Sequence, residues 1–178
     1  MKKEALLHFS VLIIYFVLIT LYKRWFDNPV YLLFWIGGIV GTLLPDFDHL
    51  IYSYISRPHD LTSQRARLMI SSREVGKAAD LLAITRYERS SPIFHTAFFQ
   101  IFFAAFTFFV ITSTGSLLGR GLVLAFLLHL TVDQTKDYLD TDSLDRWFYN
   151  LNVKPTTQTA SFYLLINFLL LVFFGLFF

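Results

Sequence analysis

Four of the chain's five histidines stand at the ends of apolar segments, and carboxylates accompany them. Imidazole nitrogens and carboxylate oxygens are the ligands that zinc, manganese and iron(II) accept in proteins. Ionisable side chains are costly to hold at membrane depth, and a bound cation would offset that cost. The sequence therefore predicts one shared metal site. Its candidate ligands are His8, Asp46, Asp48, His49, His95, His129 and Asp133.

His129 and Asp133 form the sharpest pair, because residues four apart share one face of a helix and can reach the same ion. A hydrogen-bonded structural His–Asp pair would have the same spacing. His8 and His95, each taken alone, also fit an ordinary packing histidine. Asp137 continues the helix face of Asp133, which makes it a candidate partner of a ligand or an additional ligand.

The string Pro45-Asp46-Phe47-Asp48-His49 offers three donors within four residues. Proline disfavours helix at the residue before it, so an apolar helix should end or kink at Leu44. The irregular backbone that follows would let the donors turn toward a common point. A helix cap at the membrane interface is the alternative. His59 lies far from any apolar segment and is expected at the surface.

The composition indicates an all-α, polytopic membrane protein. Of 178 residues, 55% are hydrophobic, and 21 are Phe, whereas soluble domains are roughly 45–50% apolar. Apolar segments of nearly spanning length predict five transmembrane helices within a single membrane domain, residues 1–178. They cover about residues 5–22, 30–44, 92–112, 117–132 and 161–178. The absence of cysteine excludes thiolate ligands, and the scattered net charge of +2 gives no reason to expect nucleic acid.

The long segment 46–91 is expected to carry one further helix. Ser71 and Glu74 have the spacing of a capping box and precede apolar residues at helical periodicity. We therefore expect an amphipathic helix at about 72–87, lying on the inner membrane face in contact with anionic headgroups. A solvated helix is the alternative.

The ordered motifs resemble the YdjM-like family of inner-membrane-associated, metal-dependent hydrolases. The matching pieces are His8, the string Leu43-Leu44-Pro45-Asp46-Phe47-Asp48-His49, the pair His95-Thr96, and the His-x3-Asp motif of His129 and Asp133. The chain departs from the family's His-Arg-Gly-x-Thr-His-Ser string, since Ser90 to Thr96 lacks its first His and its Arg. The resemblance implies metal-dependent hydrolysis in the inner membrane and brings no substrate with it.

These observations lead to a functional hypothesis. The expected protein is a hydrolase that uses a divalent metal, zinc before manganese or iron, to cleave a lipid-linked ester or phosphoester at the cytoplasmic membrane face. Seven candidate ligands exceed what one tetrahedral zinc needs, so either two ions bind or a carboxylate is free to act as general base. Asp48 and Asp133 are the candidates for that role. Membrane lipids are the expected partners.

Two other function classes would use the same residues differently. A transporter would use the cluster as an ion site, but it should also carry polar groups through the full membrane depth or show repeats. A non-enzymatic, membrane-organising protein would use the cluster as a hydrogen-bonded plug.

The positive charges predict the orientation. With the N-terminus inside, the inner segments carry twelve of the chain's 15 Lys and Arg residues. Cytoplasmic loops have such an excess. The N-terminus and all the histidine-bearing helix ends are therefore expected on the cytoplasmic side of the inner membrane.

This orientation predicts the outcome of a reporter experiment. A reporter enzyme fused after Arg65 should be active in the cytoplasm, and one fused after Lys23 should be active outside it. An external signal at Arg65 would reverse both the orientation and the inferred side of the chemistry.

Overall fold

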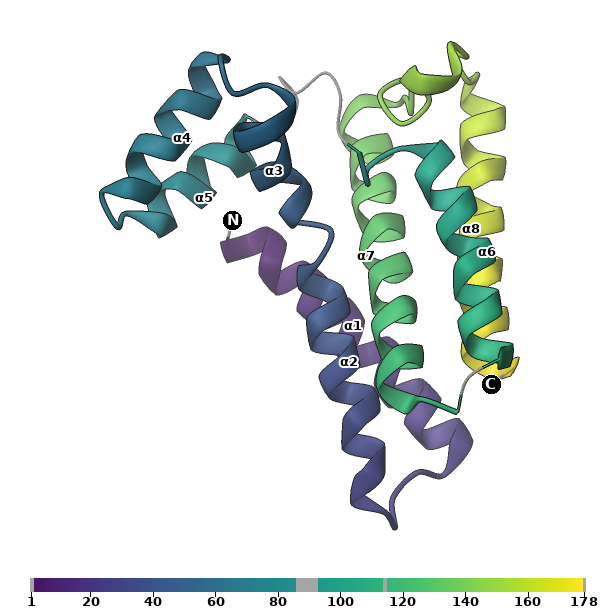
Figure 1. The fold of residues 1–178 in the computed structure, drawn as a ribbon. Coiled ribbons are helices and arrows are strands. Elements are labelled where there is room, and N and C mark those ends of the chain that lie inside the picture. Colours follow the sequence, from purple (N-terminus) through teal and green to yellow (C-terminus); the bar gives the residue numbers. More distant parts are fainter. Residues whose placement is uncertain (1, 86–92, 114, 178) are drawn as a thin grey trace.

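In the computed structural model, the described residues 2–85, 93–113 and 115–177 form helices and connecting turns without strands, as the sequence predicts (Figure 1). The α-helices are α1 (Lys2–Lys23), α2 (Leu32–Leu43), α3 (Phe47–Ile51), α4 (Leu61–Ser71), α5 (Val75–Ile84), α6 (Ala97–Ser113), α7 (Leu117–Thr141) and α8 (Thr157–Phe177). Short 3-10 turns cover Pro29–Tyr31 and Tyr149–Leu151, and a π-helical turn covers Tyr52–Ser56.

Four helical segments are long and apolar enough to cross a membrane. They are Glu4–Lys23, Pro29–Ser56, Leu117–Thr141 and Thr157–Phe177, and α6 is a shorter apolar helix of 17 residues. Their outward faces expose large apolar side chains, such as Leu6, Phe102 and Phe168, each more than 60% exposed. Contiguous apolar surface of this kind is not left to water in soluble monomers. The fold is compatible with that of a helical membrane protein.

The apolar segment predicted at about 30–44 ends where the sequence predicts, whereas the one predicted at about 117–132 forms a longer helix. The helix breaks after Leu43, as Pro45 predicts, and resumes as α3 at Phe47. In contrast, α7 does not end near residue 132 but continues to Thr141, where Asp142 closes it in the left-handed conformation. His129 and Asp133 therefore lie within α7 and not at its end.

In the described part of segment 46–91, α3 and its π-helical turn are followed by two longer helices, α4 and α5, where the sequence predicted a single amphipathic helix at about 72–87. Ser71 ends α4 and does not cap a following helix, because Arg73 adopts a φ of 63°. The N–H of Arg73 bonds the carbonyl of Ile70, and that of Glu74 bonds Met69. These two bonds define a Schellman ending. It folds the chain back into an α4–α5 hairpin, with α5 beginning at Val75.

Glycines bring α2 into backbone contact with α7, which lies between the α1–α2 pair and α6 with α8 (Figure 1). A Cβ placed on Gly37 or Gly41 would stand 2.1 or 2.2 Å from a carbonyl oxygen of α7, and one on Gly121 would stand 2.0 Å from the carbonyl oxygen of Phe34. Small residues at this spacing allow such close helix packing in membranes. The contact holds the Pro45 turn beside the middle of α7.

A buried amide network ties α7 to α6 and α8. Gln134 donates to Gln100 on α6 at 2.9 Å and accepts from Asn167 on α8 at 3.1 Å. The hydroxyl of Tyr163 also donates to Gln100, at 3.0 Å. Buried polar groups that satisfy one another in this way fix the register of packed helices.

We expect Gly41→Ala to destabilise the protein, because the added methyl group would force α2 and α7 apart. Overpacking of this kind costs about 1–3 kcal/mol. Thermal unfolding in detergent, followed by circular dichroism, should show a lower midpoint. Gly76→Ala on α5 is the matched control, since nothing lies within 4 Å of its added Cβ. Equal midpoints for the two variants would contradict the close contact.

Candidate metal centre

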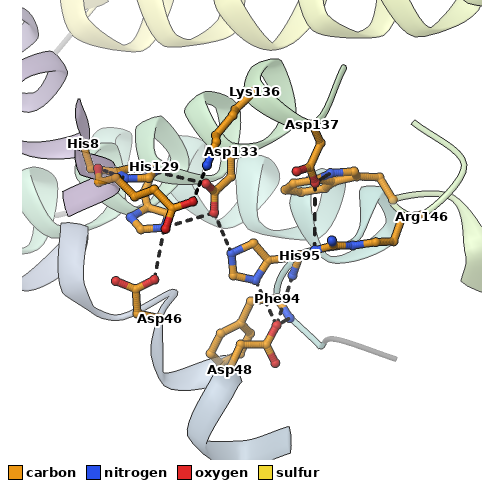
Figure 2. Close-up of polar contacts among 12 residues, drawn as sticks. His8, Asp46, Asp48, Phe94, His95, His129, Asp133, Lys136, Asp137 and Arg146 are labelled. Atoms are coloured by element: carbon orange, nitrogen blue, oxygen red, sulfur yellow. Dashed lines mark hydrogen bonds and ion pairs between the residues drawn. The ribbon is translucent and has the colours of Figure 1, made fainter. Parts of the chain in front are cut away.

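Three imidazoles surround the carboxylate of Asp133 (Figure 2). His95 Nε2 lies 3.0 Å and His129 Nε2 3.4 Å from Oδ2, and His8 Nε2 lies 3.3 Å from Oδ1. All four side chains are buried. The i, i+4 spacing of His129 and Asp133 on α7 thus places both groups on one face, as the sequence predicts, and α1 supplies His8 to the same point.

The ring of His8 is oriented so that Nε2 can accept a metal. Its Nδ1 lies 2.9 Å from the backbone carbonyl of Glu4, and a carbonyl can only accept, so Nδ1 carries the proton. The lone pair of the neutral ring is then on Nε2, which is buried and makes no hydrogen bond. Metal-binding histidines characteristically donate their other N–H in this way.

His129 completes a set of donors that fits a divalent cation. Its ring stacks on that of His8, with centroids 4.0 Å apart, and both of its nitrogens are buried without a hydrogen bond. One ligand atom from each of His8, His129 and Asp133 lies within 4.8 Å of the others. Leaving such nitrogens unpaired in the protein interior is costly, and a bound metal ion would satisfy them. Two imidazoles and a carboxylate also match a known ligand set of catalytic zinc.

Asp48 and His95 form a buried pair beside this set. The carboxylate of Asp48 accepts from the backbone N–H groups of Ile93 and Phe94, both at 2.9 Å, and from that of His95 at 3.3 Å. It also lies 3.0 Å from His95 Nδ1. Asp48 therefore holds the chain segment before α6 and orients the His95 ring.

His95 precedes α6 and lies between two carboxylates, those of Asp48 and Asp133. Its Nδ1 and its Nε2 each lie 3.0 Å from an oxygen of one of these carboxylates, which matches a ring that donates from both nitrogens. Both ring nitrogens donate when the ring is protonated. In this arrangement His95 bridges the two carboxylates and offers no lone pair to a metal.

The remaining predicted ligands lie around the centre at different depths. Asp46, in the turn after α2, has a side chain that is 57% exposed and an Oδ1 3.7 Å from His129 Nε2. His49 on α3 is half-buried, and its ring lies nearly parallel to that of His95 with centroids 5.6 Å apart. All seven predicted residues thus gather in one region, but only three of them form the compact donor set. His59 is exposed, as expected.

Asp137 takes part in the site only through another side chain. Its carboxylate accepts from Trp147 Nε1 at 2.9 Å and lies 3.9 Å from Arg146 Nη2. The buried Trp147 ring packs edge-on against His95, with centroids 5.8 Å apart. Asp137 therefore supports the position of His95 and does not reach the donor set. No spacing in the sequence points to this role of Trp147.

Glu4 and Lys136 are two further residues that the sequence did not single out. They form an ion pair between α1 and α7, and Lys136 lies beside Asp133 in Figure 2. Glu4 precedes His8 by four residues and Lys136 follows Asp133 by three, so helical spacing alone could have suggested both.

A cavity of about 250 Å³ opens onto the centre. His8, Asp46, His49, His129 and Asp133 line one side of it, and residues of α5 line another. The donor set is thus accessible to a small ligand from the cavity.

Comparisons of the chain with protein-family models, with curated proteins and with solved structures found no match. The family resemblance and the metal-dependent chemistry that it implies therefore remain predictions.

We expect His8→Ala and His129→Ala each to weaken zinc binding by at least about 10–100-fold. Losing a residue that only hydrogen-bonds a metal ligand already lowers metal affinity by that factor, and losing the ligand itself should cost no less. Purified protein should be titrated with zinc in detergent, and retained metal measured by mass spectrometry. His59→Ala is the matched control, because His59 is exposed and lies away from the cavity. Undiminished zinc binding in both test variants would exclude this donor set.

Proposed function

We propose that this chain is a metal-dependent hydrolase of the inner membrane, acting on a lipid-linked ester or phosphoester at the cytoplasmic face. In this proposal α6 is a fifth span, the N-terminus is cytoplasmic, and zinc is the preferred ion, with manganese or iron as alternatives. The proposal rests mainly on the buried nitrogens of His8 and His129. These nitrogens have no hydrogen bond and lie next to Asp133.

The arrangement of the carboxylates supports catalysis in addition to metal binding. His8, His129 and Asp133 would hold the ion, leaving a coordination position for water, as catalytic sites do. A divalent ion bound there would supply a water of lowered pKa and polarise the bond to be cleaved. Asp46, which lines the cavity beside His129, is the carboxylate best situated to accept the proton from that water.

The sequence suggested Asp48 or Asp133 as the general base, and the contacts of both favour other roles. Asp48 accepts three backbone N–H groups and His95, so protonation would disrupt the hydrogen bonds that hold the segment before α6. Asp133 lies among three imidazoles and belongs to the donor set. Asp46 is exposed to the cavity and free of such constraints.

The substitution Asp46→Asn should distinguish a general base at this position from a metal ligand. We expect it to keep the fold and the zinc while lowering turnover of a lipid ester or phosphoester by about 10²–10⁴-fold, the usual contribution of a positioned base. Asp48→Asn is the matched comparison, and we expect it to lower the thermal midpoint as well, because a buried carboxylate with four donors is lost. Turnover and unfolding should be measured on the same zinc-loaded preparations.

Three results would contradict parts of this proposal. Undiminished turnover in Asp46→Asn would exclude Asp46 as the base. Loss of zinc from that variant would make Asp46 a ligand. Zinc flux into proteoliposomes, without hydrolysis of any lipid, would favour a transporter that uses the same donors.

A further inference from the structure

We propose that the cavity beside the metal centre binds a single acyl chain, and that the substrate is an uncharged carboxylic ester of a lipid with one such chain. This inference rests on the proposed hydrolase function and names its substrate class.

The two sides of the cavity differ in polarity. The polar side carries the donor set, whereas helix α5 contributes only aliphatic side chains, namely Val75, Ala78, Ala79, Leu82 and Ala83. Away from the cavity, the exposed Lys77 of α5 forms an ion pair with Glu74, which precedes the helix. An apolar surface that begins at a hydrolytic centre fits a substrate whose bond to be cleaved adjoins a hydrocarbon chain.

The charges around the cavity favour an uncharged ester over a phosphoester. Glu4, Asp46 and Asp133 line it, and its described lining includes neither Lys nor Arg. Lys136 lies nearby, but it is paired with Glu4. Phosphate sites characteristically use Arg, Lys or helix N-termini to neutralise the ligand. With Glu4 paired to Lys136 and Asp133 assigned to the ion, Asp46 still adds negative charge beside the centre and no basic residue of the described lining would hold a phosphate, whereas an ester carbonyl carries no net charge.

The size of the cavity favours one chain over two. Its volume of about 250 Å³ is smaller than the roughly 300–1,000 Å³ of sites for drug-sized ligands. The space suffices for an ester group and the first methylenes of one chain lying along α5.

The reaction would be ordinary ester hydrolysis. Water adds through its oxygen to the acyl carbon, and Asp46 takes the proton that the water loses. The bond between the acyl carbon and the alcohol oxygen then breaks, and the departing alcohol oxygen receives that proton from Asp46. The products are a fatty acid and a free alcohol, and no oxidant or further reactant is required.

Two substitutions on α5 test the chain site. Ala79→Leu and Ala79→Phe place increasing bulk in the apolar side of the cavity, whereas Gly76→Phe, on the same helix, lies outside the cavity lining and has nothing within 4 Å of its Cβ. The probes are glycerol monoesters of butanoic, octanoic, dodecanoic and hexadecanoic acid, with hexadecyl phosphate as the phosphoester. The hexadecyl ether of glycerol, which cannot be hydrolysed, measures binding by calorimetry without metal.

We expect kcat/KM to rise with chain length in the unaltered protein. Each buried methylene is worth about a fourfold change. A side chain that displaces two methylenes should therefore lower both kcat/KM for the hexadecanoyl ester and affinity for the ether about 15-fold. Ala79→Phe should show this loss, Ala79→Leu a smaller one, and Gly76→Phe none. Zinc content should be unchanged in all three variants, and butanoyl ester turnover should be unchanged in Gly76→Phe.

The two proposals fail in different ways. Ether binding with the expected pattern, but no turnover of any probe, would overturn the hydrolase function and leave the chain site standing. Turnover of hexadecyl phosphate in preference to the esters would overturn the substrate class and leave hydrolysis standing. Turnover independent of chain length, or equal losses in Ala79→Phe and Gly76→Phe, would exclude the chain site.

Discussion

The buried carboxylate of Asp133 is the group on which the arrangement of this protein depends. A charge in the interior of a membrane protein is costly unless it is paired and hydrogen-bonded. His95, before α6, lies within hydrogen-bond distance of Asp133, and His8 on α1 and His129 on α7 itself lie 3.3 and 3.4 Å from its carboxylate, where a shared cation would complete the pairing. The helices must therefore come together at one depth, and the glycine contact between α2 and α7 and the amide network around Gln134 hold them there.

The surroundings of each carboxylate give it a different chemistry. Asp48 is saturated by backbone donors, Asp133 is enclosed by imidazoles, and Asp137 is bound to an indole N–H. Asp46 alone among these four is substantially exposed, and it lines the cavity. A site with carboxylates in such different environments can divide ligand, positioning and base roles among residues of the same type.

The sequence predicted what short-range spacing determines. The break at Pro45, the shared face of His129 and Asp133, and an all-helical fold with apolar helices of spanning length all follow from helix geometry and composition. It failed where contacts are distant in the sequence or where a residue adopts an uncommon conformation. Asp48 meets backbone groups 45 to 47 residues away, and a left-handed Arg73 has no sequence signal comparable to glycine. The single helix predicted at about 72–87 corresponds to α5, and the sequence missed α4 and the turn that joins the two helices.

The α4–α5 hairpin also explains how one cavity could combine a metal centre with an apolar chain site. A metal centre needs donors held rigidly, whereas a chain site needs only apolar surface of suitable width. The compact donor set here comes from α1 and α7, which belong to the helical bundle, and the aliphatic side of the cavity comes from α5, which packs against α4. Substitutions on α5 can therefore change the width of the cavity without moving His8, His129 or Asp133. Because the donors and the apolar side belong to different elements, reactivity and selectivity can be altered independently.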